Sequence, residues 1–329
     1  MTVGPSAPGT VAVVICAYTE KRWDDVLDAY HSVLGQSVVP DEVILVVDHN
    51  PALLARLTLA CPRALVIANT AGNGLSGARN TGIEAADSDI VLFLDDDARA
   101  ADGWVEQMVA PFTDPQVQGV AGWADPNWDG AGQPRWFPEP FLWVVGCSYE
   151  GMPTTQVPVR NPLGCSMAFR RPALAELGGF TSGIGRVGTH PVGCEETEFS
   201  IRLRQRDPAA RILSAPGAVV HHRVTENRRT LGYFSRRCYW EGVSKALVAK
   251  GVGRNDALAT ERSYVSTVLP RAVFRGVKDA LRGDVHGLLR GAAVVYGLGA
   301  TSLGYVRGLR AAAQTELVEA TPLVRSEAA

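Results

Sequence analysis

Short runs of apolar, often β-branched residues recur along the first part of the chain and predict buried strands. The runs are Val11–Ala17, Glu42–Asp48, Ala64–Ala68 and Ile90–Leu94. Apolar residues with helical spacing separate them, first from Asp24, the expected N-cap, to about Leu34, and then over Leu75–Ala86. Strands and helices in this order predict an α/β fold in which a mostly parallel sheet is flanked by crossover helices.

The pattern changes twice after this first part. Residues 122–162 are rich in Trp, Pro and Gly. The next elements expected are a strand over Ser166–Arg170, a helical turn over Pro172–Leu177, a helix over 194–206 and a short strand over Ala218–His222. Beyond Arg228 the spacing is helical, over 230–250, about 257–282 and 284–310. We therefore expect a disordered leader over 1–10, an α/β domain over 11–227, a basic helical extension over 228–310 and a flexible tail over 311–329.

The distribution of charge adds information about partners. The 329 residues carry a formal net charge of −2, so binding of nucleic acid through overall charge is not expected. Residues 228–310, however, hold fifteen Lys and Arg against five Asp and Glu, a balance of +10 that favours an anionic partner. Their uncharged stretch Gly291–Val306 is shorter than the ~20 residues that span a bilayer. We expect peripheral attachment to an anionic membrane surface; the alternatives are a helical subdomain packed on the core and a homo-oligomer formed through these helices.

The amino-terminal residues and the cysteines bear on the cellular compartment. Residues 1–10 lack the basic and apolar regions of a secretory signal peptide. None of the six cysteines belongs to a CxxC pair, and the chain is too long for a small disulfide scaffold. We expect a cytoplasmic protein, either free or bound to the inner face of the cell membrane.

Three aspartates directly after Ile90–Leu94 form the first candidate site. Asp95, Asp96 and Asp97 repel one another unless a cation or protons neutralise them. Carboxylates at the end of a buried strand suit Mg²⁺ or Mn²⁺. Ligands of parallel sheets bind at the carboxyl ends of the strands, and Tyr18 and Asp48 lie at two further such ends. The alternative for the aspartates is a solvated acidic loop or a helix cap.

Glu195, Glu196 and Glu198 form a second acidic cluster at the start of the expected helix over 194–206. Helical geometry places Glu195 and Glu198 on one side and Glu196 about 100° away. Capping of the helix dipole is the commoner reason for such clusters. The turn-rich lead-in GTHPVGC instead favours the rim of a site, where a carboxylate can act as a general base.

Two further features are weaker signals. His221 and His222 end a short strand, where neighbouring side chains point in opposite directions, so only one of the two can face a site. Gly72–Gly74, followed by Arg79 and Asn80 in the next helix, is similar to a loop that approaches a phosphate. It matches neither GxxxxGKS/T nor GxGxxG, so neither P-loop nor Rossmann-type dinucleotide chemistry is expected.

Taken as an ordered set, several segments resemble the family 2 glycosyltransferases of the GT-A fold. They are VVICAYTE (13–20), EVILVVD (42–48), GLSGARNTGI (74–83), FLDDDA (93–98), NPLGCSMAFRR (161–171), LGGF (177–180) and CEETEFSIR (194–202). The resemblance covers about residues 11–225. The runs VVDHNPALL, RWFPEPFLWVVGCSY and GCEETE further resemble a branch that includes dolichyl-phosphate-glucose glucuronosyltransferase-like enzymes.

The resemblance implies a role for each matching residue. The expected donor-binding residues are Ala17, Tyr18, Glu20, Asp48, Arg79, Asp95 and Asp96. Asp95 and Asp97 would form the DxD motif, with Asp97 as the direct metal ligand, and His221 (or His222) would be a late metal ligand. Glu196 would be the general base, although the family usually has Asp there. The acceptor side would include Trp136, Asn161, Gly164, Cys165 and Glu195.

The function implied is that of an inverting, metal-dependent glycosyltransferase that uses Mg²⁺ or Mn²⁺. Its donor would be a nucleotide-diphosphate sugar, with UDP as the expected nucleotide, and its acceptor a hydroxyl group, either of a polyprenyl-linked sugar or of a cell-surface glycan precursor. The alternatives are a transferase acting on a small natural product, a non-catalytic protein that binds nucleotide sugars, and a nucleotidyltransferase. The family often has Asp-Gly-Ser where this chain has Asp48-His49-Asn50, so only Asp48 carries over.

Overall fold

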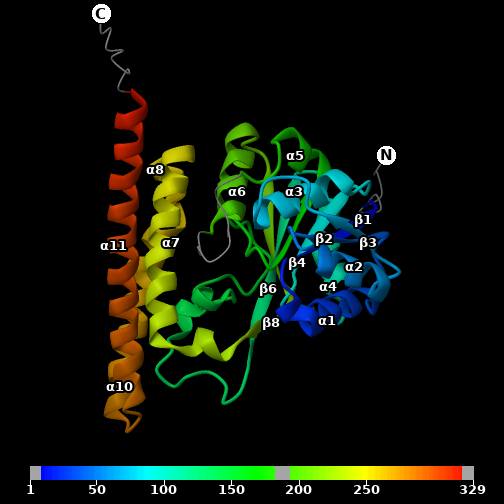
Figure 1. Cartoon of the computed structure of the whole chain (residues 1–329). Coiled ribbons are helices and arrows are strands. Elements are labelled where there is room, and N and C mark those ends of the chain that lie inside the picture. Colours follow the sequence, from blue (N-terminus) through cyan, green and yellow to red (C-terminus); the bar gives the residue numbers. More distant parts are fainter. Residues whose placement is uncertain (1–8, 182–192, 321–329) are drawn as a thin grey trace, which may run out of the picture.

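The computed structural model describes residues 9–181 and 193–320, and its core is an eight-stranded sheet (Figure 1). The strands lie in the order β3-β2-β1-β4-β7-β6-β8-β5. Their bounds are β1 Val11–Ala17, β2 Glu42–Val47, β3 Leu65–Ala68, β4 Ile90–Asp95, β5 Ala98–Ala100, β6 Val117–Trp128, β7 Ser166–Arg170 and β8 Arg211–Val224. The predicted leader lies outside the described residues except for Gly9 and Thr10.

The predicted parallel arrangement is confirmed in the first half of the sheet. Strands β1, β2, β3 and β4 pair in parallel, which aligns their carboxyl ends along one edge. The second half is mixed, because β7 is antiparallel to both β4 and β6, β8 is parallel to β6, and β5 is antiparallel to β8. The α/β class is therefore correct.

Helices cover both faces of this sheet because its strands are apolar on both sides. In β1, Val13 and Ile15 belong to one core cluster, while Ala12 and Val14 belong to the other. The first cluster packs under α1 (Trp23–Leu34), α2 (Pro51–Ala60) and α4 (Trp104–Val109). The second packs under α3 (Leu75–Ala85), α5 (Arg171–Glu176) and α6 (Glu195–Arg206).

Two local predictions need correction. The first helix begins at Trp23, directly after the 3-10 turn η1 (Glu20–Arg22), so Asp24 is not its N-cap. Asp24 instead lies in the first turn, where a carboxylate still interacts favourably with the helix dipole. The last strand, β8, is much longer than Ala218–His222, because it continues through Pro216–Gly217 with a register shift against β6.

The C-terminal extension is helical, as predicted, but its helices are divided differently. They are α7 Leu231–Val252, α8 Arg254–Ala257, α9 Ala259–Ser263, the π turn η5 Tyr264–Val268, α10 Leu269–Leu281 and α11 His286–Ala320. The single helix expected over 257–282 is therefore divided, and α11 continues past the expected end at 310. The remaining short 3-10 segments are η2 Ala110–Thr113, η3 Glu139–Val145 and η4 Glu226–Arg229.

Helices α7 and α11 lie side by side on one flank of the molecule (Figure 1). Glycines permit this close approach: a Cβ at Gly242 would lie 2.0 Å from the Thr301 carbonyl oxygen, and one at Gly304 would lie 1.9 Å from that of Tyr239. On its inner side α7 joins an aromatic cluster in which Phe234 contacts Phe137 and Phe141. Among the described helices, none combines the length and apolar content needed to cross a membrane.

Candidate active site

A cavity of about 200 Å³ opens at the edge where the parallel strands end. This is where ligands of such sheets bind, because the loops that follow neighbouring strands meet there. Its lining includes the strand-end residues Ala17, Tyr18, Asp48, Asp95, Asp96 and Asp97. The helical extension supplies part of the wall through Tyr233 and Arg237 of α7, which lie beside Arg228 of η4. The site is thus built by both halves of the chain.

Asp48 is held by the Gly-rich segment that the sequence singled out. The Asn69 amide nitrogen donates to Asp48 Oδ1 at 2.6 Å, and the backbone N–H of Gly74 donates to Asp48 Oδ2 at 3.0 Å. Gly74 has φ 105°, a left-handed conformation that glycine adopts without strain. The segment therefore orients a carboxylate in the cavity wall.

Arg79 is fully buried and joins three elements. Its Nη1 lies 2.7 Å from Glu195 Oε1 at the start of α6, and its Nη2 lies 3.2 Å from Asp95 Oδ1 at the end of β4. Nη2 also donates to the Gly164 carbonyl oxygen at 2.9 Å. A buried guanidinium needs this many acceptors, because burial without partners is costly. Arg79 thus fixes the two acidic clusters relative to each other.

The Asp96–Asp97 pair is neutralised by arginines that the sequence did not single out. Arg22 pairs with both carboxylates, and Arg228 Nη2 lies 3.0 Å from Asp97 Oδ2. Burial raises the pKa of Asp96 to about 7, against the opposing charge of Arg22. Burial also acts to raise the pKa of Asp97, but the charges of His222, Arg228 and Arg22 hold it well below its usual value. Of the two carboxyls, Asp97 therefore has the lower pKa.

Asp95, Asp97 and His222 form a group able to hold a metal ion. One ligand atom from each residue lies within 4.8 Å of the others, and His222 Nε2 lies 3.3 Å from Asp97 Oδ1. Two carboxylates and a neutral imidazole suit Mn²⁺ well and allow Mg²⁺, so His222 would give up the proton that pairs it with Asp97 when it binds the metal. The buried Asp96 Oδ2 has no hydrogen-bond partner, which leaves one more oxygen beside this group. The residues present fit a divalent cation.

The structure also decides which histidine faces the site. His221, the expected ligand, is exposed, whereas its neighbour His222 is buried in the cavity wall. Every second residue in this part of β8 is buried, namely Ala218, Val220, His222 and Val224. The same alternation in the sequence could have indicated that His222 faces inward. His222 replaces His221 in the candidate site.

Glu196 differs from its two acidic neighbours in having no arginine partner among the described residues. Glu195 pairs with Arg79, and Glu198 pairs with Arg202 at 2.6 Å. Glu196 is half-buried, lines the cavity and makes no ion pair in the described structure. Burial, and next the charge of Glu195, raise the pKa of Glu196 to about 8. A carboxyl with such a pKa can accept a proton near neutral pH.

The turn before these glutamates is held from outside by α7. Cys194 precedes α6 with φ 75°, a conformation that costs a non-glycine residue about 1 kcal/mol. Its Sγ lies 3.3 Å from Glu241 Oε1, and the N–H of Gly193 donates to Ser244 Oγ at 3.1 Å. Of the lead-in GTHPVGC, residues 188–192 lie outside the described residues.

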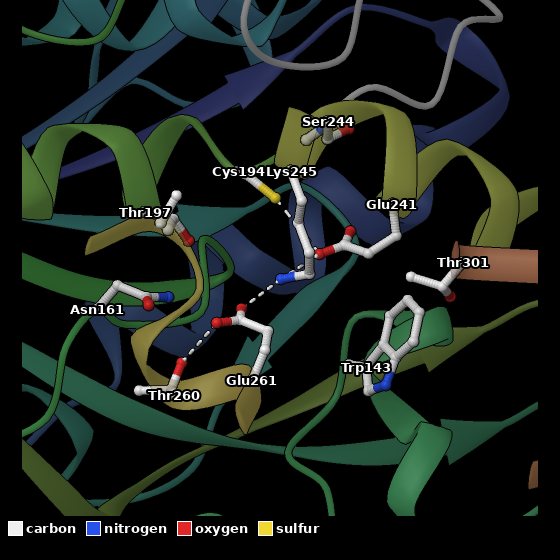
Figure 2. A network of polar contacts seen from close by, with 12 residues as sticks. Trp143, Asn161, Cys194, Thr197, Glu241, Ser244, Lys245, Thr260, Glu261 and Thr301 are labelled. Carbon is white, nitrogen blue, oxygen red and sulfur yellow. Dashed lines mark hydrogen bonds and ion pairs between the residues drawn. The ribbon is translucent and has the colours of Figure 1, made fainter. Parts of the chain in front are cut away.

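Glu241 belongs to a half-buried chain of charges shown in Figure 2. Lys245 Nζ lies 3.3 Å from Glu241 and 2.6 Å from Glu261, which in turn receives two hydrogen bonds from Arg160. Burial alone would disfavour these charges, but the two glutamates raise the pKa of Lys245. The network therefore keeps α7, α9 and the loop before β7 in one fixed arrangement beside α6.

Besides His221, three of the predicted site residues lie outside the cavity. Glu20 is exposed and pairs with Arg56, and Trp136 packs in the aromatic cluster beside Phe137. Asn161 accepts a hydrogen bond from Arg160 Nε at 2.8 Å and does not line the cavity. The other predicted residues, Gly164, Cys165 and Glu195 included, do line it, apart from His221. Arg22, Arg228 and Arg237 were missed because each comes from a segment without a motif.

Sequence comparison places the chain among known proteins. The family model described as Glycosyl transferase family 2 matches residues 12–178. The chain is 31% identical over 305 residues to the glucosyl-dolichyl phosphate glucuronosyltransferase of Haloferax volcanii, with 91% of this chain and 96% of that protein covered. It is also 25% identical over 297 residues to the succinoglycan biosynthesis protein ExoM of Rhizobium meliloti, with 84% and 90% covered.

Structural comparison agrees with the fold. The mannosyltransferase PcManGT from Pyrobaculum calidifontis, in complex with GDP-Man and Mn²⁺, superposes with a TM-score of 0.56 at 19% identity, covering 92% of this chain and 88% of that one. GalNAc-T7 with UDP, GalNAc and Mn²⁺ superposes with a TM-score of 0.54 at 17% identity; 79% of this chain is covered, but only 58% of that protein. Both likenesses concern the fold, which is GT-A.

Proposed function

Because the chain belongs to glycosyl transferase family 2 and is a glycosyltransferase, we propose that it moves a sugar from a nucleotide-diphosphate donor, UDP-sugar above all, to an acceptor hydroxyl. The observation that carries this proposal is the meeting of two groups in one cavity. Asp95, Asp97 and His222 lie on one side, and Glu196, which has no arginine partner in the described structure, lines the same cavity. A metal group for the leaving diphosphate and a base for the acceptor are what such a transfer requires.

The donor would occupy the edge formed by Tyr18, Asp48 and the acidic triplet. Asp48 is already oriented by Asn69 and Gly74, and Tyr18 is exposed at the rim, where its ring can stack on a base. Asp95, Asp97 and His222 would hold Mg²⁺ or Mn²⁺, which when bound supplies positive charge to the departing diphosphate. Arg22 and Arg228 add two cations to the same wall.

Glu196 would act as the general base in a single inverting displacement. Its carboxylate takes the proton of the acceptor hydroxyl, the acceptor oxygen forms a bond to the anomeric carbon, and the bond from that carbon to the diphosphate oxygen breaks. The nucleoside diphosphate leaves with the bonding electrons. Glu195 would keep Arg79 in place during this step, since the two form a buried ion pair.

The acceptor we propose is a sugar carried on a polyprenyl phosphate lipid at a membrane surface. The support is the name of the Haloferax volcanii relative, together with the near full-length match to it. Trp143 of η3 and Tyr233 and Arg237 of α7 line the cavity, so aromatic and cationic groups border the space that a sugar phosphate would enter. A small natural product as acceptor would make activity independent of lipid or detergent.

A donor panel tests the proposal. UDP- and GDP-sugars are incubated with the full chain and Mn²⁺, with and without EDTA, and nucleotide release and thermal stabilisation are measured. Metal-dependent release is expected with one UDP-sugar, and transfer is expected when a polyprenyl-phosphate-linked sugar is added. Glu196→Gln should keep donor-induced stabilisation but lose turnover by about 10²–10⁴-fold. Stabilisation without turnover in the unmodified chain would instead indicate a non-catalytic binder.

A further inference from the structure

Exposed apolar side chains are concentrated on the helical extension. Of the eighteen large hydrophobic residues that are exposed in the described structure, twelve lie between Leu231 and Val306. The most exposed of them gather where α10 meets α11: Phe274 is 72% exposed, Leu281 85% and Val285 66%. Single exposed apolar residues need no explanation, but a cluster of them marks an interaction surface.

This cluster has an ordered arrangement on α10. Phe274, Val277 and Leu281 follow one another at helical spacing and form a stripe on the exposed side, while Leu269, Ala272 and Gly276 face the protein. Val285 in the following turn and Leu288 and Leu289 at the start of α11 are exposed as well. A Cβ at Gly276 would lie 2.4 Å from the Gly287 carbonyl oxygen, so the two helices pack closely at this point.

A row of basic side chains runs beside the apolar stripe. Arg271, Arg275, Lys278 and Arg282 are all exposed and lie at helical spacing on the adjoining side of α10. Arg275 pairs with Glu150, but Arg271, Lys278 and Arg282 form no ion pair with any described residue. Three cations that have no ion-pair partner among the described residues are therefore available to phosphate groups outside the protein.

We propose that this surface, formed by α10, the following turn and Leu288–Leu289, docks the enzyme on an anionic membrane. The apolar stripe would enter the region between headgroups and acyl chains, and the basic row would contact the lipid phosphates. The purpose of such docking, to bring the site to a lipid-linked acceptor, rests on the proposed function. The docking itself requires neither the donor nor the transfer.

The charge of the extension favours a membrane over a second copy of the chain as the partner of this surface. Residues 228–310 carry a balance of +10, so a symmetric dimer through this surface would bring two strongly basic segments together. An anionic bilayer complements the same charge.

Vesicle flotation of the full chain tests the docking surface without any donor or acceptor. The chain is mixed with vesicles of phosphatidylcholine alone or with phosphatidylglycerol added. We expect flotation with the anionic vesicles, and its loss in the double variant Phe274→Glu/Leu281→Glu. The triple variant Arg271→Glu/Lys278→Glu/Arg282→Glu should partition at least about a hundredfold more weakly, since each basic residue near the surface contributes about fivefold.

Leu59→Glu on α2 is the matched control, because Leu59 is as exposed as Leu281, at 85%, but lies on the catalytic domain. It should float like the unmodified chain. Metal-dependent donor hydrolysis in lipid-free solution should remain in every variant, which separates failure of docking from failure of the proposed chemistry. Absence of flotation with both vesicles would overturn the proposal. So would a dimer in solution that Phe274→Glu dissociates, because the second copy would then be the occupant.

Discussion

Cys194 Sγ lies 3.3 Å from Glu241 Oε1, so the residue that precedes helix α6 is held by a side chain of the C-terminal extension. Glu241 is in turn fixed by Arg237 at 3.2 Å and Lys245 at 3.3 Å. The left-handed backbone at Cys194 is thereby supported by contacts outside its own loop. The position of Glu195 and Glu196 depends on α7 as well as on the sheet.

Glu241→Gln should lower turnover with little change in the Michaelis constant for the donor. The variant removes the charge that orders Arg237 and Lys245, and we expect a loss of about tenfold or more, typical of a small misplacement of catalytic groups. The negative charge of Glu241 also contributes to the raised pKa of Glu196. The midpoint of the pH–rate profile should therefore move to lower pH. Glu176→Gln, in the exposed pair with Arg206, is the control and should change neither quantity.

The rate of transfer should rise with pH up to about 8, the raised pKa of Glu196. Below that pH most of this carboxyl is protonated and cannot accept the acceptor's proton, so the rate should fall about tenfold per pH unit. The check is kcat/KM for the acceptor measured from about pH 5.5 to 9.5 at saturating metal. A profile that is flat, or that declines over this interval, would contradict the role given to Glu196.

His222→Gln and His221→Gln form a matched pair for the metal site. Mn²⁺ at about a hundred times its dissociation constant should stabilise the unmodified chain by about 2.7 kcal/mol, measured by thermal or urea unfolding. His222→Gln should lose most of that stabilisation, because the imidazole faces Asp97 at 3.3 Å. His221→Gln should retain it, since this side chain is exposed. Equal behaviour of the two variants would remove His222 from the ligand set.

Arg79→Met should destabilise the fold by about 3–5 kcal/mol in urea unfolding, because Glu195 would remain buried as an unpaired charge. Arg79 and Glu195 have only 2% and 5% of their side-chain surface exposed. Arg206→Met breaks an exposed ion pair and should cost at most about 1 kcal/mol. A loss as small as that of Arg206→Met would contradict the stabilising role given to the buried pair.

The sequence predicted the site best where a polar residue directly follows an apolar run that forms a strand. The apolar runs at Val11–Ala17 and Ile90–Leu94 specified buried strands, and polar residues directly after them fell at one sheet edge by topology alone. The order of motifs was enough to identify the family. Tyr18, Asp48 and Asp95–Asp97 were therefore predictable as cavity residues.

Residues that depend on distant packing were not predictable in this way. Arg22 and Arg228 meet at Asp97 although 206 positions separate them in the chain, and neither segment has a motif. Trp136 was expected on the acceptor side, but its ring packs on Phe137 and on Phe234 of the extension. The division of α8, α9 and α10 also followed from packing and not from the spacing of apolar residues.

The placement of Arg228 and Glu241 has a consequence for how this enzyme can change during evolution. Both residues lie beyond position 227, yet one neutralises Asp97 and the other supports the turn before α6. An exchange of the extension between relatives would have to carry these residues with their partners, or the recombinant would lose its active site. The sequence on the inner side of α7 should therefore change slowly among relatives. The sequence on the outer side of α10 can change with the surface that it contacts.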